Sequence, residues 1–376
     1  MPRNPSVSLR CVILAAQLTA VGAACAGWTI VDLGSLDGRN SYATAINNSD
    51  QVVGYSTFGG GSPFVHTPFF WENGLLTDLG ILGGGDWARA ECVNASGLVG
   101  GYSRAAPLPS WHAFVWTGGA TTDLGSAGGS QTAVYGINDA GWVVGQDNSI
   151  GAFYWNGTSF VDLDSTVPSG WTSLNVARAI NDNSMIVGDG RNSAGLNHAF
   201  LYDAGAGTAV DLGAFVTGVG ITSTANAISN SNVVVGSSQN GETYGDDEVE
   251  VSRAFVWESG VMTDLGTLGG ALSMAFDVNE STQVVGRATR TSDGEDDPFY
   301  AFLWEDGVMT DLNDLLPPGG DWVLREARGI NDLGHIVGFG TFQGVDRAFL
   351  LVPEPATLGL LGLGALLLTS RRRLTA

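Results

Sequence analysis

Two acidic segments are the clearest candidates for metal chemistry in this sequence. Neighbouring carboxylates supply the hard oxygen ligands that Ca²⁺ prefers, although neither segment has the fixed spacing of a calcium-binding loop. A solvated acidic patch is the simpler interpretation, so we predict that no cofactor is required and keep Ca²⁺ as a hypothesis. The candidate ligands are Asp246, Asp247, Glu248 and Glu250 in the first segment and Asp293, Glu295, Asp296 and Asp297 in the second.

Three tryptophans indicate another chemistry, the binding of sugars. Trp87, Trp171 and Trp322 stand in similar contexts, which read GGGDWARA, PSGWTSLNVARA and PGGDWVLREARG. An indole ring stacks well on a sugar ring, but a tryptophan in a loop can also simply pack that loop. We treat the three as candidate ligand-binding residues, with loop packing as the alternative.

Side chains that could catalyse a reaction lack the arrangement that catalysis needs. His112 and His198 open two equivalent His-Ala-Phe segments without a second ligand at short spacing, which predicts strand-edge residues and not a zinc site. Cys92 occupies a repeat position that is otherwise mostly small, which indicates a buried and inert thiol. No nucleophile elbow, phosphate loop or metal motif is found. The sequence therefore predicts a protein that is not an enzyme.

A glycan-active enzyme, either a glycosidase or a lyase, is the main alternative. It would use clustered carboxylates and arginines, and two inward carboxylates about 5 to 10 Å apart beside an arginine would favour it. Asp277 is the one acid at the position that Cys92 also occupies. The arginines expected in nearby loops are Arg89, Arg178, Arg325 and Arg328. A flat and apolar loop surface would instead favour a protein-interaction scaffold.

These candidates belong to a repeat with seven copies. Each copy has an aliphatic residue, then Asn (Ser229 in one copy), a turn, two mostly aliphatic residues and Gly. The Asn side chain can close the turn on its own backbone. The fifth position holds residues that tolerate a positive φ, apart from Ser184 and Thr282, so each copy predicts a hairpin with a bulged turn. The copies are residues 46–54, 93–101, 137–145, 180–188, 228–236, 278–286 and 330–338.

A second hairpin follows each of the first ones, and it ends in an Asp-Leu strand. Asn73-Gly74 and Asp306-Gly307 are strong hairpin signals within these segments. Four short strands in about 47 residues is the size of a propeller blade. Because the first Asp-Leu strand, at Asp32, precedes any complete repeat, the N- and C-terminal strands must pair to complete the last blade. We predict an all-β fold, a seven-bladed β-propeller of four-stranded blades closed in this way; which strand of each blade is innermost stays open.

The predicted topology separates the tight turns from the variable connections. Antiparallel strands place alternate connections on opposite faces, so both hairpin turns of each blade lie on one face and both variable loops on the other. Function in propellers usually resides where loops vary. The three tryptophans and both acidic segments fall in such loops.

Neither end of the chain reads as part of the propeller. Residues 1–26 combine Arg3 and Arg10, an apolar run and a small-residue cleavage pattern, which predicts a secretory signal peptide. Residues 27–352 form the propeller. Residues 353–376 contain Pro353, Glu354 and Pro355, a short apolar stretch that predicts a short transmembrane helix, and Arg371, Arg372 and Arg373, which the positive-inside rule keeps in the cytoplasm.

The C-terminal order of Pro-Glu-Pro, apolar helix and Arg cluster resembles the PEP-CTERM sorting signal. The resemblance implies transient tethering in the inner membrane, cleavage by an exosortase-type enzyme and delivery to the cell surface or extracellular matrix. Residues 28–351 resemble the HAF-repeat family of extracellular proteins, for which His112-Ala113-Phe114 is one instance of the tripeptide. That family implies an exported repeat protein without known catalytic residues.

Together these features predict a non-catalytic surface or matrix protein that associates with exopolysaccharide or with another surface protein. A formal charge of −22 repels phosphate backbones, so nucleic acid is not an expected partner.

Overall fold

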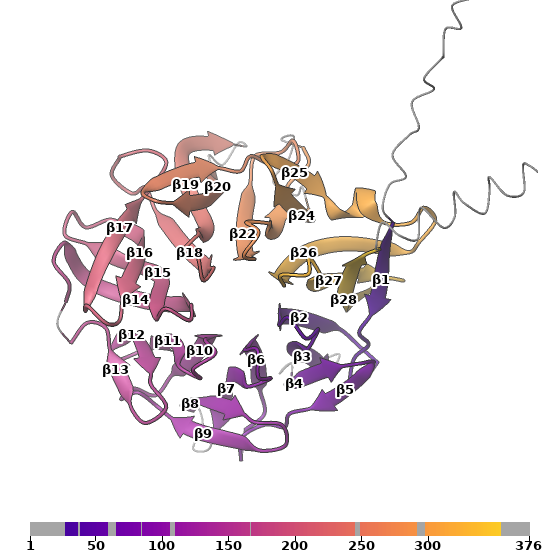
Figure 1. Cartoon of the computed structure of the whole chain (residues 1–376), viewed down its shortest axis with the longest axis horizontal. Coiled ribbons are helices and arrows are strands. Elements are labelled where there is room, and N and C mark those ends of the chain that lie inside the picture. Colours follow the sequence, from indigo (N-terminus) through magenta and orange to yellow (C-terminus); the bar gives the residue numbers. More distant parts are fainter. Residues whose placement is uncertain are drawn as a thin grey trace, which may run out of the picture. The chain divides into compact units, whose positions relative to one another are not determined.

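The structure is a computed structural model that describes residues 27–354, apart from residues 37, 59–64, 84, 106–109, 166, 245–248 and 292–297 and the side chains of residues 58, 244 and 249. Seven four-stranded antiparallel sheets surround a central axis (Figure 1). The predicted seven-bladed propeller is therefore confirmed. No helix among these residues is long and apolar enough to cross a membrane, and the predicted C-terminal helix lies outside them.

Each blade consists of consecutive strands, except the last. The first three blades are β2 (Ser41–Ile46), β3 (Val52–Phe58), β4 (Val65–Glu72), β5 (Leu75–Asp78); β6 (Ala88–Val93), β7 (Val99–Ala105), β8 (Ser110–Trp116), β9 (Thr121–Gly125); and β10 (Thr132–Ile137), β11 (Val143–Asp147), β12 (Gly151–Trp155), β13 (Phe160–Asp162). The next three are β14 (Trp171–Ile180), β15 (Met185–Asn192), β16 (Asn197–Asp203), β17 (Thr208–Gly213); β18 (Ser223–Ile228), β19 (Val234–Tyr244), β20 (Val249–Glu258), β21 (Val261–Asp264); and β22 (Ser273–Val278), β23 (Val284–Ala288), β24 (Tyr300–Glu305), β25 (Val308–Asp311). The seventh is β26 (Trp322–Ile330), β27 (Ile336–Phe342), β28 (Val345–Pro353) and β1 (Trp28–Asp32), and a short 3₁₀ helix, Leu312–Leu315, precedes it.

In each blade, the strand next to the axis is the first one. This answers the question that the sequence left open. β2, β6, β10, β14, β18, β22 and β26 surround the centre of the ring, and each contacts the corresponding strand of both neighbouring blades (Figure 1). The repeated Asn hairpins therefore begin at the axis, and the Asp-Leu strands form the rim.

The ring is closed by the two ends of the propeller. β1 pairs antiparallel with β28, from Trp28 opposite Pro353 to Asp32 opposite Phe349. The predicted pairing of terminal strands is thus confirmed, and it leaves β28 without an open edge. Pro353, assigned to the sorting signal, is also the last residue of β28.

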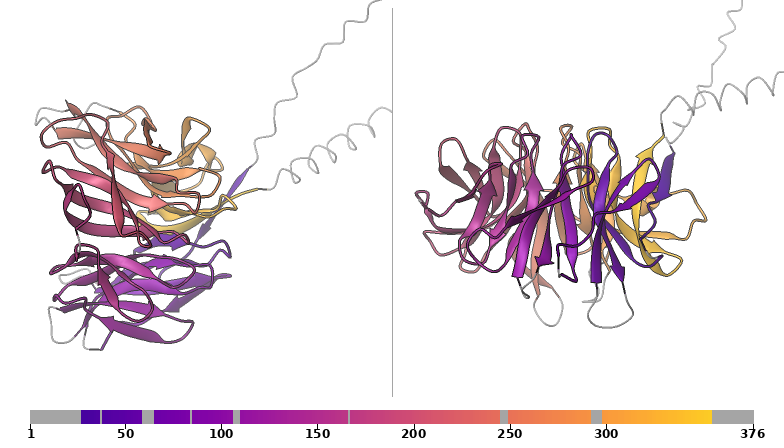
Figure 2. Two further views of the ribbon diagram at one scale, coloured as in Figure 1. Left: turned by 60° about the vertical axis from the view of Figure 1, so that its left-hand side comes forward. Right: turned by 90° about the horizontal axis from the view of Figure 1, so that it is seen from below.

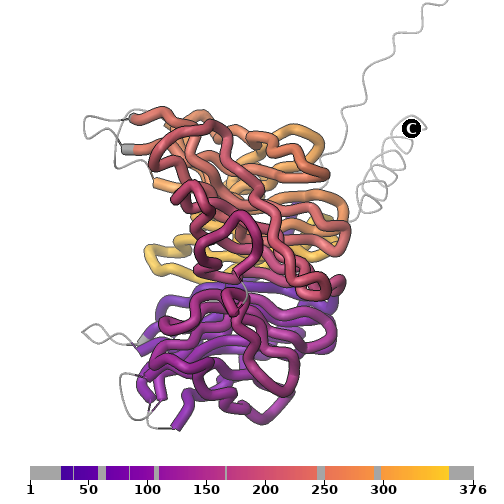
Figure 3. The backbone as a smooth tube through the Cα atoms, turned by 90° about the vertical axis from the view of Figure 1, so that its left-hand side faces the viewer, coloured from indigo at the N-terminus to yellow at the C-terminus, as the bar shows by residue number. Residues whose placement is uncertain are grey.

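We call the face that carries the first-to-second and third-to-fourth strand turns the hairpin face, and the opposite one the loop face. The antiparallel order of every sheet enforces this division, as the sequence predicted, and the edge-on view in Figure 2 separates the two faces. Since β28 is a third strand, it ends at the hairpin face, and β1 begins there. The tube in Figure 3 shows the blades side by side along the ring.

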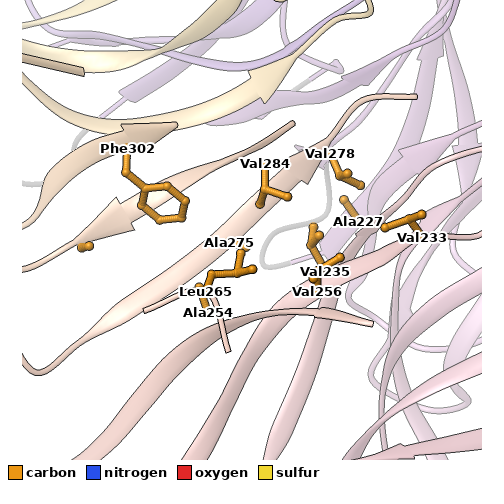
Figure 4. Packing of buried hydrophobic residues seen from close by; sticks show 11 residues of the cluster. Ala227, Val233, Val235, Ala254, Val256, Leu265, Ala275, Val278, Val284 and Phe302 are labelled. Atoms are coloured by element: carbon orange, nitrogen blue, oxygen red, sulfur yellow. The ribbon is translucent and has the colours of Figure 1, made fainter. Parts of the chain in front are cut away.

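Each blade has one phenylalanine at its centre, opposite the glycine of the repeat. Phe114 pairs with Gly101 across two strands, and a Cβ at Gly101 would overlap the Arg89 carbonyl oxygen and lie 2.8 Å from the Phe114 ring. The repeat therefore needs glycine for space, not for an unusual φ. Apolar side chains from adjacent blades fill the interfaces, as in the cluster around Phe302 (Figure 4). The seven phenylalanines, all fully buried, are Phe69, Phe114, Phe153, Phe200, Phe255, Phe302 and Phe349.

The repeated Asn closes its own turn and also joins the blades. Asn47 Oδ1 accepts from the backbone N–H groups of Ser49 and Gln51, while its Nδ2 donates to the carbonyl oxygen of Asn94 at 2.8 Å. The fifth residue has a φ between 58° and 78° in all seven copies, including Ser184 and Thr282, so these departures from the pattern do not change the turn. The same inter-blade donation recurs from Asn94, Asn138, Asn181, Asn279 and Asn331.

Ser229 is where this ring of amide hydrogen bonds is interrupted, because its hydroxyl bonds within its own turn. We expect Ser229→Asn to raise the free energy of unfolding by about 1 kcal/mol, since the new amide can donate to the Asn279 carbonyl oxygen. Asn138→Ser, which removes the equivalent bond, should lower it by a similar amount. Denaturant midpoints of both variants check this, and a lower midpoint for Ser229→Asn would contradict it.

The rim aspartates have a structural role as well. Asp78 Oδ1 accepts from the Gly80 N–H at 2.7 Å, and the equivalent bond forms at Asp32, Asp123, Asp162, Asp211, Asp264 and Asp311. His112 and His198 bind Asp123 and Asp211 of the same blades through Nδ1, both at 2.9 Å. The prediction that these histidines are strand residues is confirmed.

Candidate ligand-binding face

The three candidate tryptophans lie in three different blades and in different surroundings. Trp171 is 6% exposed, is the first residue of β14 and packs edge-on against Phe200 in the core, so its rings are not accessible to a sugar. Trp322, the first residue of β26, stacks on Phe342 with 4.8 Å between ring centroids. Trp87 immediately precedes β6 and is half-buried on the loop face. Of the three, Trp87 is the one that joins a larger group of aromatic side chains on this face.

Trp87 belongs to a continuous series of ring contacts that we call the aromatic band. It stacks on His66 at 4.7 Å and meets Trp111 edge-on at 4.7 Å. From His66 the contacts continue to Tyr55 at 4.9 Å and from there to Tyr42 at 5.1 Å. The complete band, which runs from the seventh blade through the first and second to the third, is Phe339, Tyr42, Tyr55, His66, Trp87, Tyr102, Trp111 and Tyr135.

The guanidinium group of Arg89 contacts three rings in the middle of the band. Arg89 Cζ lies 4.1 Å from the Tyr55 ring centroid and 4.9 Å from that of Trp87, and its Nε donates to His66 Nδ1 at 3.1 Å. Burial, together with the Arg89 charge, lowers the pKa of His66 to about 4. His66 is therefore a neutral hydrogen-bond acceptor at physiological pH, and the band carries the charge of Arg89 alone at this point.

Next to the band, the side chains at one axial position vary from blade to blade, and arginine is the only type that occurs twice. Glu91 lines a cavity of about 60 Å³ with Arg89, Arg328, Tyr42 and Tyr55, among others. Burial raises the pKa of Glu91 to about 7, against the opposing effect of Arg89 and Arg328. The residues at the register of Glu91 are Thr44, Glu91, Tyr135, Arg178, Asn226, Phe276 and Arg328. The repeat is therefore chemically asymmetric at the axis.

Asp277, the acid singled out from the sequence, accepts hydrogen bonds from the backbone of its own blade and of the next blade. It lines a central cavity of about 330 Å³ together with Glu91, Arg178 and Arg328. Its carboxylate oxygens accept from the N–H groups of Val278 and of Ile330 in the next blade, both at 2.9 Å. Burial nevertheless raises its pKa to about 7. The expectation that Arg89, Arg178, Arg325 and Arg328 lie in loops was wrong, because the innermost strands extend through all four.

The raised pKa of Glu91 predicts a pH dependence of stability. The folded state favours the protonated carboxyl. The contribution of Glu91 to the stability of the fold is therefore complete below its ordinary pKa of 4.5 and is lost as the pH rises through about 7. Glu91→Gln should make the fall in melting temperature between pH 5 and pH 8 smaller. The remaining fall should be the one caused by Asp277, whose pKa is also raised. Identical pH profiles for wild type and variant would contradict the assignment.

Sequence reasoning did not find Trp111, Tyr102, Tyr135 or Glu91. The available signal was the alignment of the repeats, in which large or charged side chains stand at positions that differ in type from blade to blade. The acidic candidates Asp246, Asp247, Glu248, Asp293, Glu295, Asp296 and Asp297, and Pro355 with Arg371, Arg372 and Arg373, lie outside the described residues. Within the described part, no three His, Cys, Asp or Glu side chains are grouped so that they could hold a metal ion.

Comparison with known proteins identifies the C-terminal segment. Residues 351–373 match the model of the PEP-CTERM protein-sorting motif, which implies export, transient membrane anchoring through this region and recognition by an exosortase-type enzyme. The chain matches no curated protein.

The solved structures that resemble the chain do so at very low sequence identity. The β-propeller domain of the Trilobed protease from Pyrococcus furiosus has a TM-score of 0.47 and 8% identity over 83% of this chain and 95% of its own. TolB from Acinetobacter baumannii gives 0.40 and 10% over 81% and 80%. Trypanosoma rangeli sialidase gives 0.39 and 8% over 86% and 59%.

Proposed function

We propose that this protein is a non-catalytic module of the cell surface or extracellular matrix that binds exopolysaccharide through its loop face. The aromatic band carries the proposal, because it joins eight contiguous rings, all but Phe339 with a polar edge group, and so combines the apolar rings and hydrogen-bonding groups that suit sugars. The export implied by residues 351–373 supports a destination where such polymers occur. We also propose that the repeats are of the HAF type, with Ca²⁺ as an optional ligand of the acidic loops.

Co-sedimentation of the purified mature protein with the producing cell's own exopolysaccharide tests the proposal. We expect the wild type to sediment with the polymer and Trp87→Ala to lose most of this binding, because the variant interrupts the band. Trp322→Ala, which removes a partly buried indole from the seventh blade, should retain it, and melting curves of both variants report folding. Absence of wild-type co-sedimentation would refute the proposal and favour a protein partner.

Calcium enters as a separate arm of that experiment. Binding that chelation abolishes would support a role for the acidic loops as Ca²⁺ ligands. Binding that survives chelation would leave the aromatic band as the binding determinant. In both cases the exopolysaccharide proposal stands.

A glycan-active enzyme is the second candidate, and Glu91 is the observation that favours it. A carboxyl with a pKa of about 7 that lines one cavity with Arg89 and Arg328 has the properties of a general acid. The test is product release from the same polymer, read as new reducing ends or unsaturated sugars. Release by the wild type and not by Glu91→Gln would replace the binding proposal with an enzymatic one.

A further inference from the structure

A third cavity lies where the second and third blades meet on the loop face. Its volume is about 260 Å³, and it is distinct from the two cavities that Glu91 lines. Trp111 and Tyr102 of the second blade and Tyr135 of the third contribute aromatic rings, with 5.4 Å between the Trp111 and Tyr102 centroids. The other lining residues are Gln131, Thr132, Ala133, Gln146 and Asn148.

None of the residues that line this cavity carries a formal charge at neutral pH. The hydroxyl of Thr132 already binds Asp147 at 2.6 Å, and Asn148 accepts from the N–H groups of Ser130 and Gln131. The side-chain amides of Gln131 and Gln146 have no hydrogen-bond partner among the residues that the structure describes. The cavity therefore offers two unused primary amides beside three aromatic rings.

This combination matches the chemistry of a neutral sugar ring. An amide can donate and accept at once, as two neighbouring hydroxyl groups require, and aromatic rings pack against the C–H face of a pyranose. The nearest cation is Arg104, whose Cζ lies 5.2 Å from the Trp111 ring centroid; it does not line the cavity, and its Nη1 is paired with Asp86 at 3.3 Å. A uronic acid or another anionic sugar would therefore bring a carboxylate into a lining that has no unpaired cation, which is costly on partial burial. The lining thus selects against charge.

Trp87 holds the site in position without lining it. Its ring contacts Trp111 edge-on and Tyr102 at 5.4 Å, and its own faces are occupied by His66 and Arg89. The backbone N–H of Trp111 also donates to the carbonyl oxygen of Ser130 at 2.9 Å. This bond fixes the start of β8 against the loop that carries Gln131. The two walls of the cavity are therefore joined by the fold before any ligand binds.

We propose that this cavity is a subsite for one neutral hexopyranose unit of a polysaccharide, with Trp111 as the stacking residue and Gln131 and Gln146 as the hydroxyl-binding residues. The inference rests on the proposed exopolysaccharide-binding function and narrows it to neutral sugars at one inter-blade position.

Titration calorimetry of the full mature protein with two sets of tetrasaccharides tests the subsite. One set is neutral and contains glucose, galactose or mannose, and the other contains the matching uronic acids. We expect binding of at least one neutral member and none of its acidic counterpart, with affinity reduced about tenfold by Trp111→Ala and severalfold by Gln146→Ala. Trp111→Tyr should restore most of the affinity because it retains an aromatic face.

Trp142→Ala is the matched control, since Trp142 is a half-buried indole of the third blade that stacks on Tyr154 at 5.2 Å, away from the cavity. Its affinity should equal that of the wild type. Tighter binding of the acidic set, no binding of any neutral sugar, or equal affinities of Trp111→Ala and wild type would overturn the subsite.

Co-sedimentation distinguishes failure of the subsite from failure of the proposed function. Wild-type binding to exopolysaccharide that Trp111→Ala retains would overturn the subsite and leave the function standing. Binding of tetrasaccharides that depends on Trp111, without any binding of exopolysaccharide, would refute the proposed function and leave the subsite standing.

Discussion

Gly101→Ala is expected to prevent the second blade from closing and to lower the free energy of unfolding by more than about 3 kcal/mol. The added Cβ would overlap the Arg89 carbonyl oxygen and meet the Phe114 ring at 2.8 Å. Because backbone, and not a flexible side-chain end, stands in the way, β6 and β7 must separate to admit it. Urea denaturation followed by circular dichroism measures the loss.

Gly83→Ala is the matched control for this substitution. A Cβ at Gly83 would meet nothing within 4 Å, and its φ is not in the left-handed region, so the stability should change by less than about 0.5 kcal/mol. If the two variants unfold at the same denaturant concentration, the packing of Gly101 against Phe114 is not needed for the second blade to close.

Deletion of residues 27–34 is expected to have an equally large effect. It removes β1, so the seventh blade keeps three strands and β28 presents a row of unpaired backbone groups. It also uncovers Leu350 and Leu351, which are now 4% and 0% exposed. We expect a much lower melting temperature and concentration-dependent association in size-exclusion chromatography.

A synthetic peptide of residues 27–34 provides the control, because it can pair with β28 in trans. Recovery of monomer and of the melting temperature on its addition is expected, while a peptide of the same composition in scrambled order should have no effect. A deletion variant that stays monomeric and melts like the wild type would show that β1 does not close the ring.

The architecture was predictable because the features that define a blade recur within single segments of the chain. The Asn turn, the glycine and the Asp-Leu strand are each local, and seven copies make the pattern distinct. The mismatch in phase between Asp32 and the first complete repeat was enough to predict the closing pair. In each case the signal lies in residues that contact one another across one turn or one strand pair.

The position of the site was less predictable, because it depends on contacts between blades. The sequence did not show that the first strand of each blade extends several residues ahead of the repeated segment, so Arg89 and Arg178 were taken for loop residues. Trp111 has no special context, and it becomes part of a cavity only because the Gln131 loop of the next blade packs beside it. Trp171 shares a sequence context with Trp87 but points into the core, since its strand β14 begins earlier than β6 does.

The pairing of Trp28 with Pro353 has a consequence for how many copies could act together. The first and last strands of the propeller, β1 and β28, both have their free ends at the hairpin face, opposite the loop face. Copies held by these ends on one surface would present the proposed sugar-binding face in the same direction. A polymer bound by one copy then meets its neighbours at high effective concentration, so weak individual sites can give strong collective retention.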